Sequence, residues 1–204
     1  MSTSALCLNL LVAGTAFWFF LRASHFSWEL TWPFTVASIP FAFIGGFLKV
    51  PAAFYSLLLA FVLIFAAVRL IFDSTGEQHT FKLPSLKISL PLGGAIGILS
   101  GVVGVGGGIF LSPLLLIFRW ADPKKTAATS ACFILVNSLA GLLGRLARHS
   151  FQLTPLFLTM VVTAFLGGMM GSRLGANHFS GRWLKRVLAG VLLIATFKLL
   201  NAFF

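Results

Sequence analysis

Charged residues are scarce in this chain, and acidic residues are the scarcest. Only 9% of the 204 residues are charged, whereas 58% are hydrophobic; an ordinary globular chain is about a quarter charged. A water-soluble fold of this composition would lack the polar residues to cover its core, so we exclude one. The acidic residues all lie in breaks between apolar runs: Glu29, Asp73, Glu77 and Asp122. Without a carboxylate at membrane depth, a cation pump is disfavoured, whereas an anion pathway is not.

The residue patterns of enzymes and metal sites are missing as well. The four histidines are scattered in the breaks without metal-ligand spacing, and the two cysteines, Cys7 and Cys132, lie inside apolar runs. The glycine-rich part of the chain does not match the G-x-G-x-x-G phosphate loop, and no Walker lysine follows it. The sequence therefore predicts no enzyme, no bound metal and no cofactor.

The net charge of +11 has a simpler origin than nucleic-acid binding. Lys and Arg cluster in the same breaks as the acidic residues. Basic loops beside membrane spans are common, whereas a nucleic-acid interface needs a basic face on a folded soluble domain. We therefore expect the lipid bilayer, and no nucleic acid, as a partner.

Long apolar runs make up the rest of the chain. A membrane helix needs about 20 mostly apolar residues. About seven segments are candidates: 4–21, 32–48, 52–72, 89–118, 126–147, 155–175 and 184–204. We predict an all-α integral membrane protein that crosses the bilayer several times.

Short segments of the first part of the chain recur, in the same order, in the second part. They are TSA at 3–5 and 129–131, AFIGG at 42–46 with AFLGG at 164–168, and LAFVLI at 59–64 with LAGVLL at 188–193. Internal duplication is common in transporters. We therefore expect a first half-repeat at 1–72, a linker loop at 73–88 and a second half-repeat at 89–204. The glycine-rich run that opens the second half has no counterpart in the first, which we expect to be short at its N-terminus.

This glycine-rich run, 89–118, is too long for one straight membrane helix. Its about 30 residues would extend about 45 Å as a helix, beyond the roughly 30 Å of the hydrocarbon core. Gly93, Gly97 and Gly101 share one helical face, which permits close packing against another helix. The length therefore predicts an interruption further along the run.

Four glycines crowd into five positions of the run, and they mark where we expect the interruption: Gly104, Gly106, Gly107 and Gly108. Each costs roughly 1 kcal/mol in a helix relative to alanine, and Pro113 removes a further backbone donor. We predict a broken or re-entrant helix near 104–108, with Pro113 as a structural break. Irregular backbone at membrane depth survives only inside protein or beside a water-filled cavity. The freed amides would then face an anion.

The distribution of Lys and Arg favours the re-entrant form of this break. If 89–118 enters and leaves on the same side, eleven of the fifteen basic residues share one face of the membrane, whereas a single crossing divides them seven to eight. The positive-inside rule favours the uneven division. We therefore expect a hairpin, with the loop 73–88 in the cytoplasm.

Four polar residues of the next span are candidates for the same site. Thr129 and Ser130 stand near its start, and they either line a binding site or cap or back-bond their own helix. Asn137 and Ser138 stand at mid-span, where a polar side chain is costly unless it is paired. They either bind a substrate or bridge to a neighbouring helix.

The combination of these motifs resembles a known family. GxxxGxxGxGGGxxxxPLLL at 97–116, AATS at 127–130 and NSLAGxxG at 137–144 are similar to the second-half signature of the sulfite exporter TauE/SafE family. The resemblance implies two similar halves and about eight spans. It also implies transport of sulfite, sulfonates or related sulfur-containing anions across the bacterial inner membrane.

Two hypotheses for function follow. The first is a multi-pass permease or exporter of the inner (plasma) membrane for a small inorganic or organic sulfur anion, bound between the two halves. The second is a non-transporting or truncated membrane subunit that needs a partner chain to supply the missing glycine-rich module. A homo-oligomer is compatible with either hypothesis.

Overall fold

The computed structural model describes residues 3–47, 81–104, 106–147 and 157–201, and these fold into helices and connecting loops. The helices are α1 (Thr3–Arg22), α2 (Trp28–Phe47), α4 (Leu86–Val103), α5 (Gly108–Ile117), α6 (Pro123–Ala147), α7 (Phe157–Asn177) and α8 (Gly181–Asn201). The prediction of an all-α protein is confirmed for the described residues. The expected segment 52–72 and the first half of the expected linker 73–88, residues 73–80, lie outside them.

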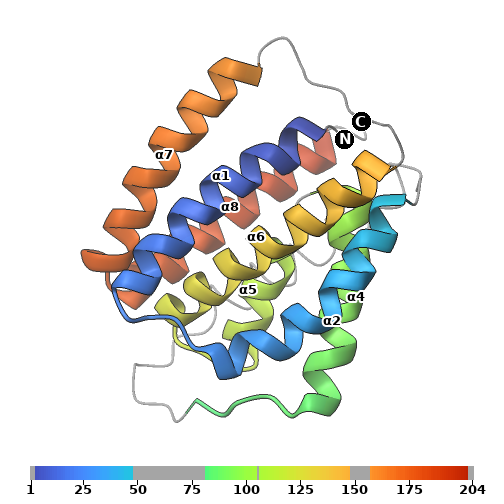
Figure 1. Cartoon of the computed structure of the whole chain (residues 1–204). Coiled ribbons are helices and arrows are strands. Elements are labelled where there is room, and N and C mark those ends of the chain that lie inside the picture. Colours follow the sequence, from blue (N-terminus) through green and yellow to red (C-terminus); the bar gives the residue numbers. More distant parts are fainter. Residues whose placement is uncertain (1–2, 48–80, 105, 148–156, 202–204) are drawn as a thin grey trace.

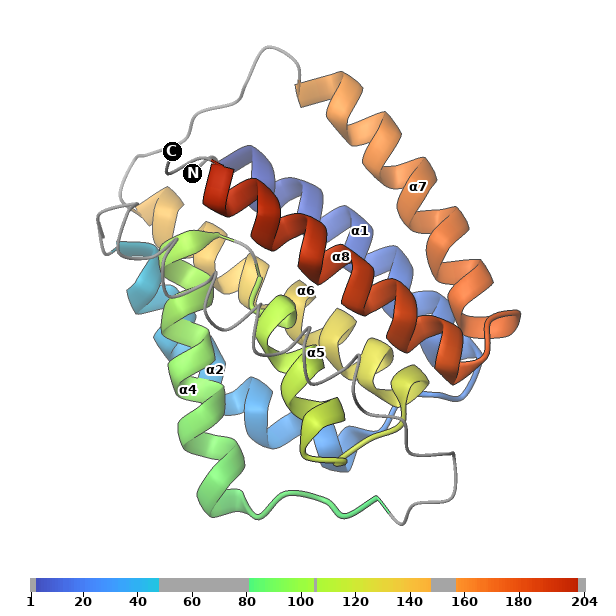
Figure 2. The ribbon, with the colours of Figure 1, turned by 180° about the vertical axis from the view of Figure 1, so that it is seen from behind.

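Helix α6 occupies the centre of the bundle. It packs against α1, α2, α4, α5 and α8, while α7 lies at the outside against α1 (Figures 1 and 2). On the other side of α6, α2 and α4 form a closely packed pair. Residues on the faces of α6 that meet these helices, such as Phe133 and Asn137, are therefore fully buried.

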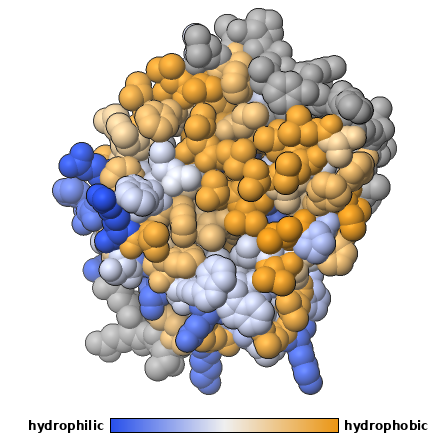
Figure 3. Space-filling model, in the orientation of Figure 1, coloured by the Kyte–Doolittle hydropathy of each residue, from blue (hydrophilic) through white to orange (hydrophobic). Residues whose placement is uncertain are grey.

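The outer surface of the bundle is apolar rather than polar. Three of the described helices, Ser4–Arg22, Trp28–Phe47 and Pro123–Gly144, are long and apolar enough to cross a membrane, and α4 and α5 are shorter apolar helices. Large hydrophobic side chains such as Met170 and Ile194 are 63% and 70% exposed. Figure 3 shows hydrophobic residues over most of one face and hydrophilic ones toward its left and lower edges. A surface of this kind fits a multi-pass membrane protein, whose solvent is lipid.

The close packing of α2 and α4 depends on glycine. A Cβ added at Gly93 would lie 2.5 Å from the carbonyl oxygen of Phe34, and one added at Gly97 would lie 2.5 Å from that of Ser38. A Cβ at Gly101 would overlap the carbonyl oxygen of Ala42. The two backbones are therefore in direct contact, as expected for small residues on one face of a membrane helix.

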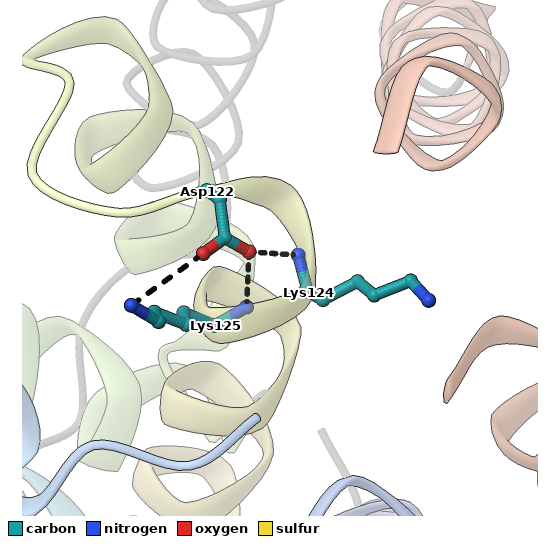
Figure 4. Close-up of polar contacts among 3 residues, drawn as sticks. All are labelled: Asp122, Lys124 and Lys125. Carbon is teal, nitrogen blue, oxygen red and sulfur yellow. Dashed lines mark hydrogen bonds and ion pairs between the residues drawn. The ribbon is translucent and has the colours of Figure 1, made fainter. Parts of the chain in front are cut away.

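The start of α6 is fixed by Asp122. Its Oδ1 accepts hydrogen bonds from the backbone N–H groups of Lys124 and Lys125, both at 2.9 Å, and its Oδ2 lies 3.8 Å from Lys125 Nζ (Figure 4). Pro123 takes the first helical position, where no N–H is needed. Because α6 begins here, Thr129 and Ser130 stand in its second turn and are not its N-cap.

Candidate functional site

The glycine-rich run is broken at the predicted place. Helix α4 ends at Val103 and is followed by Gly104, whose φ is 77°, and α5 begins at Gly108. Gly106 and Gly107 also have positive φ, at 77° and 75°. Glycine adopts this left-handed conformation without steric cost, whereas residues with a Cβ rarely do. The local sequence therefore ends one helix and permits a sharp change of direction before the next.

The chain turns back at this break. Both views show α4 and α5 running in opposite directions, with the start of α4 and the end of α5 at the same end of the molecule (Figures 1 and 2). The ring of Trp120, just after α5, lies 6.0 Å from that of Phe34, which in turn contacts Gly93 in the first half of α4. The expected break is thus confirmed, and α4 and α5 are antiparallel, as a re-entrant hairpin requires.

Pro113, in contrast, does not break the chain. It lies inside α5, which continues past it to Ile117. A proline already has a helical φ, and its main effect is the loss of one backbone hydrogen bond. The interruption expected from Pro113 is therefore wrong, and the change of direction belongs to the glycines alone.

The turn at 104–108 packs against α6. A Cβ added at Gly106 would lie 2.7 Å from Ile134 Cγ2 and 2.8 Å from the Oγ of Ser138, and one at Gly108 would overlap the side chain of Ile134. The second and fourth glycines of the motif therefore allow the turn to approach α6 closely, next to Ser138.

Gly107 lies between α4 and α6, in close contact with both helices. A Cβ at this position would lie 2.8 Å from Phe133 Cε1 on α6, and 3.0 Å and 3.1 Å from Ile96 Cγ2 and Ser100 Cβ on α4. The turn thus folds back between α4 and α6, and there is no space for a larger residue.

Thr129 and Ser130 join α6 to its neighbours. The hydroxyl of Thr129 is hydrogen-bonded to that of Thr31 on α2, at 3.2 Å. The hydroxyl of Ser130 is hydrogen-bonded to that of Ser112 on α5, at 2.8 Å, and Ser112 also donates to the carbonyl oxygen of Gly108 at 2.9 Å. Ser130 is therefore connected to the first residue of α5, whereas Thr129 points to a different helix.

Three fully buried polar atoms around the turn have no hydrogen-bond partner among the described residues: Ser100 Oγ, Asn137 Oδ1 and Ser138 Oγ. Their side chains are all 0% exposed. The amide nitrogen of Asn137 donates to the carbonyl oxygen of Phe133 at 2.9 Å, whereas the amide oxygen has no partner among the described residues. A buried polar atom without a partner costs about 1–3 kcal/mol, and each such atom in a native fold needs an explanation.

The structure therefore brings most of the expected residues together, and it adds some. Gly106, Gly107 and Gly108 lie against Ser130 and Ser138 or their neighbours on α6. Ser100 was missed, although it stands one helical turn before Gly104 and so faces the break. Asn9 of α1 also reaches the site, since its Nδ2 donates to the carbonyl oxygen of Gly104 at 3.4 Å.

The start of α5 supplies further donors. Its first backbone hydrogen bond is donated by Phe110 to the carbonyl oxygen of Gly107, at 3.1 Å. The N–H groups of Gly108 and Ile109 precede it and have no acceptor within their own helix. The partial positive charge of a helix N-terminus favours a negative ligand. Helix α5 contains no charged residue, so hydroxyls and amides dominate this site.

Comparison with known proteins gives a consistent result. The family model described as "Sulfite exporter TauE/SafE" matches residues 1–199. A probable membrane transporter protein of Sinorhizobium fredii is 33% identical over 202 residues, which are 97% of this chain and 81% of the relative. A probable membrane transporter protein of Methanocaldococcus jannaschii is 23% identical over 182 residues, or 84% of this chain and 67% of the relative. No solved structure matches the chain.

Proposed function

We propose that this chain, which belongs to the sulfite exporter TauE/SafE family, carries sulfite, a sulfonate or a related small sulfur-containing anion across the bacterial inner membrane. That the protein is a membrane transporter follows from the family and from its relatives. The substrate, the membrane and the place of binding are our proposal. It binds the anion at the turn between α4 and α5, together with Thr129, Ser130, Asn137 and Ser138 of α6.

One observation carries the proposed site: the three unpaired polar atoms of Ser100, Asn137 and Ser138 surround an irregular turn inside the bundle. Irregular backbone at membrane depth is tolerated only in a protein interior or beside a water-filled cavity. Polar groups with a purely structural role are expected to be hydrogen-bonded to one another, whereas these three atoms have no partner among the described residues. A bound oxoanion would supply the missing acceptors for the two hydroxyls.

The absence of a nearby cationic side chain in this part of the structure suits transport. Helix α5 has no Lys or Arg, and α4 has only Lys87, in its first turn. A buried anion held by hydroxyls, amides and a helix N-terminus is bound less tightly than one in an ion pair, because each of these donors carries only a partial charge. We infer that the site is polar enough to admit the anion and weak enough to release it.

The proposal is tested with the variant Gly107→Leu. The added side chain would meet Phe133, Ile96 and Ser100 in a backbone conformation that favours glycine. We expect sulfite flux in proteoliposomes to be lost while the protein still inserts into the membrane. The control is Gly171→Leu on α7, where a Cβ has no described atom within 4 Å.

Two outcomes are decisive. Normal sulfite flux in Gly107→Leu would show that the turn is not part of the pathway. Equal loss of flux in Gly107→Leu and Gly171→Leu would show that the effect is not specific to the turn. The amount of each variant in the membrane fraction, compared with that of the wild type, separates failed insertion from failed transport.

A further inference from the structure

The three unpaired atoms of the site do not have the same chemistry. Ser100 and Ser138 carry hydroxyls, each of which can donate a hydrogen bond. The oxygen of an Asn amide can only accept one. An oxoanion without a proton would satisfy both hydroxyls and leave the Asn137 oxygen unpaired.

The orientation of the Asn137 amide is fixed by its own helix. Its Nδ2 lies 2.9 Å from the carbonyl oxygen of Phe133. If the amide were flipped, two oxygens would face each other at this distance, which is unfavourable because neither can donate. The group left for a ligand is therefore an acceptor.

Helical register places this acceptor beside the turn. Asn137 stands one turn after Phe133, whose ring meets the position of Gly107, and one turn before Gly141, whose Cβ would lie 3.7 Å from Gly101 Cα. Residues four apart lie on the same helical face. Asn137 therefore lies on the face of α6 that the end of α4 and the turn cover.

We propose that the site selects an oxoanion that itself carries a hydrogen-bond donor, such as the singly protonated form of sulfite, over a fully deprotonated one. This inference rests on the proposed function and specifies the substrate of the same site. The ligand's O–H group donates a hydrogen bond to Asn137 Oδ1, and its bare oxygens accept hydrogen bonds from Ser100, Ser138 and the amides at the start of α5. Leaving the buried acceptor unpaired is expected to weaken binding roughly tenfold.

Among the residues that the structure describes, the protein's own ionisable groups do not account for this selectivity. On the helices packed against α6, and on α6 itself, the charged residues stand in the first or last two turns: Arg22, Glu29, Lys87, Lys124, Lys125, Arg145, Arg182, Lys185, Arg186 and Lys198. Of the two thiols, Cys7 lies on α1, and Cys132 precedes Asn137 by five residues, which places it about 140° around α6. The proton that distinguishes the ligands therefore belongs to the ligand.

The test is uptake of radiolabelled sulfite into proteoliposomes at equal internal and external pH, across the range in which the doubly charged sulfite ion takes up its first proton. Wild-type uptake should rise as the pH falls, in proportion to the singly protonated ion. In Asn137→Leu, the uptake should be lower and its dependence on the protonated fraction should be lost. The matched control is Asn177→Leu, because Asn177 makes the same bond to the residue four before it, Arg173, on an exposed site.

The outcomes separate this inference from the proposed function. Uptake that is constant, or that rises as sulfite loses its proton, would overturn the inference and leave the proposed transport intact. A profile unchanged in Asn137→Leu would also overturn it, because the acceptor would then have no role. Absence of uptake at every pH in the wild type would overturn the proposed function itself.

Discussion

Helices α2 and α7 contain nearly the same five residues, AFIGG at 42–46 and AFLGG at 164–168, but their surroundings differ. The second glycine of each packs in a similar way: a Cβ at Gly46 would lie 3.0 Å from an α6 backbone oxygen, and one at Gly168 would lie 3.0 Å from Val12 on α1. The first glycine of each helix, in contrast, has different surroundings. A Cβ at Gly45 would lie 2.5 Å from the carbonyl oxygen of Ile98 on α4, whereas one at Gly167 has no described atom within 4 Å.

This difference shows that the glycine pattern alone does not determine a contact. On α2 the small residues allow α4 to approach, and α4 then carries the turn into the centre of the bundle. On α7 the same pattern has no such neighbour among the described residues. Gly46 meets α6 and Gly168 meets α1, which are the two helices that correspond to each other in the predicted duplication; the duplication itself stays a prediction.

The largest effect is expected for Gly45→Ala. The added methyl group would meet backbone atoms of Ile98, Gly101 and Val102, which cannot move without separating α2 from α4. We expect a loss of roughly 3 kcal/mol of stability, at the upper end of the usual cost of overpacking. Thermal unfolding in detergent measures it. A loss below about 1 kcal/mol would mean that the two helices separate easily.

A smaller effect is expected for Gly106→Ala, within the turn itself. Here the neighbours are side chains, Ile134 and Ser138, which have more freedom to move than backbone. The φ of 77° remains unfavourable for alanine, at about 1–2 kcal/mol. We therefore expect a loss of roughly 2 kcal/mol of stability together with reduced sulfite flux. Unchanged stability would show that the turn adopts another conformation.

Ser138→Ala should change the stability in the opposite direction. Its hydroxyl is buried without a partner, so its removal should stabilise the protein by about 1 kcal/mol. The same change should lower sulfite flux, because a donor to the anion is lost. Unfolding and flux are measured on the same preparation. Destabilisation would indicate that the hydroxyl has a structural partner, and unchanged flux would place it outside the site.

Part of the fold and of the candidate site could be predicted from the sequence alone. The long apolar runs predicted the helices, since membrane thickness sets their length, and the cost of glycine in a helix predicted the break at 104–108. The prediction that Pro113 interrupts the helix is wrong, because a helix tolerates the loss of one backbone hydrogen bond. Ser100 could not be distinguished from other small residues of α4, because its importance depends on how the turn folds back. Partners such as Thr31 for Thr129 depend on tertiary packing in the same way.

The smallest effect is expected for Gly167→Ala, the counterpart of Gly45→Ala. No described atom opposes the added methyl group, so only the higher helix propensity of alanine remains. We therefore expect a gain of about 0.5–1 kcal/mol of stability, opposite in sign to the change at Gly45, and normal sulfite flux. Unfolding in detergent and flux in proteoliposomes measure the two. Stabilisation in detergent combined with loss of flux in the bilayer would mean that another chain covers this face of α7 during transport, which would favour the alternative of a subunit that needs a partner. Destabilisation in detergent would mean that another segment of the same molecule packs there, and the comparison between α2 and α7 would then fail.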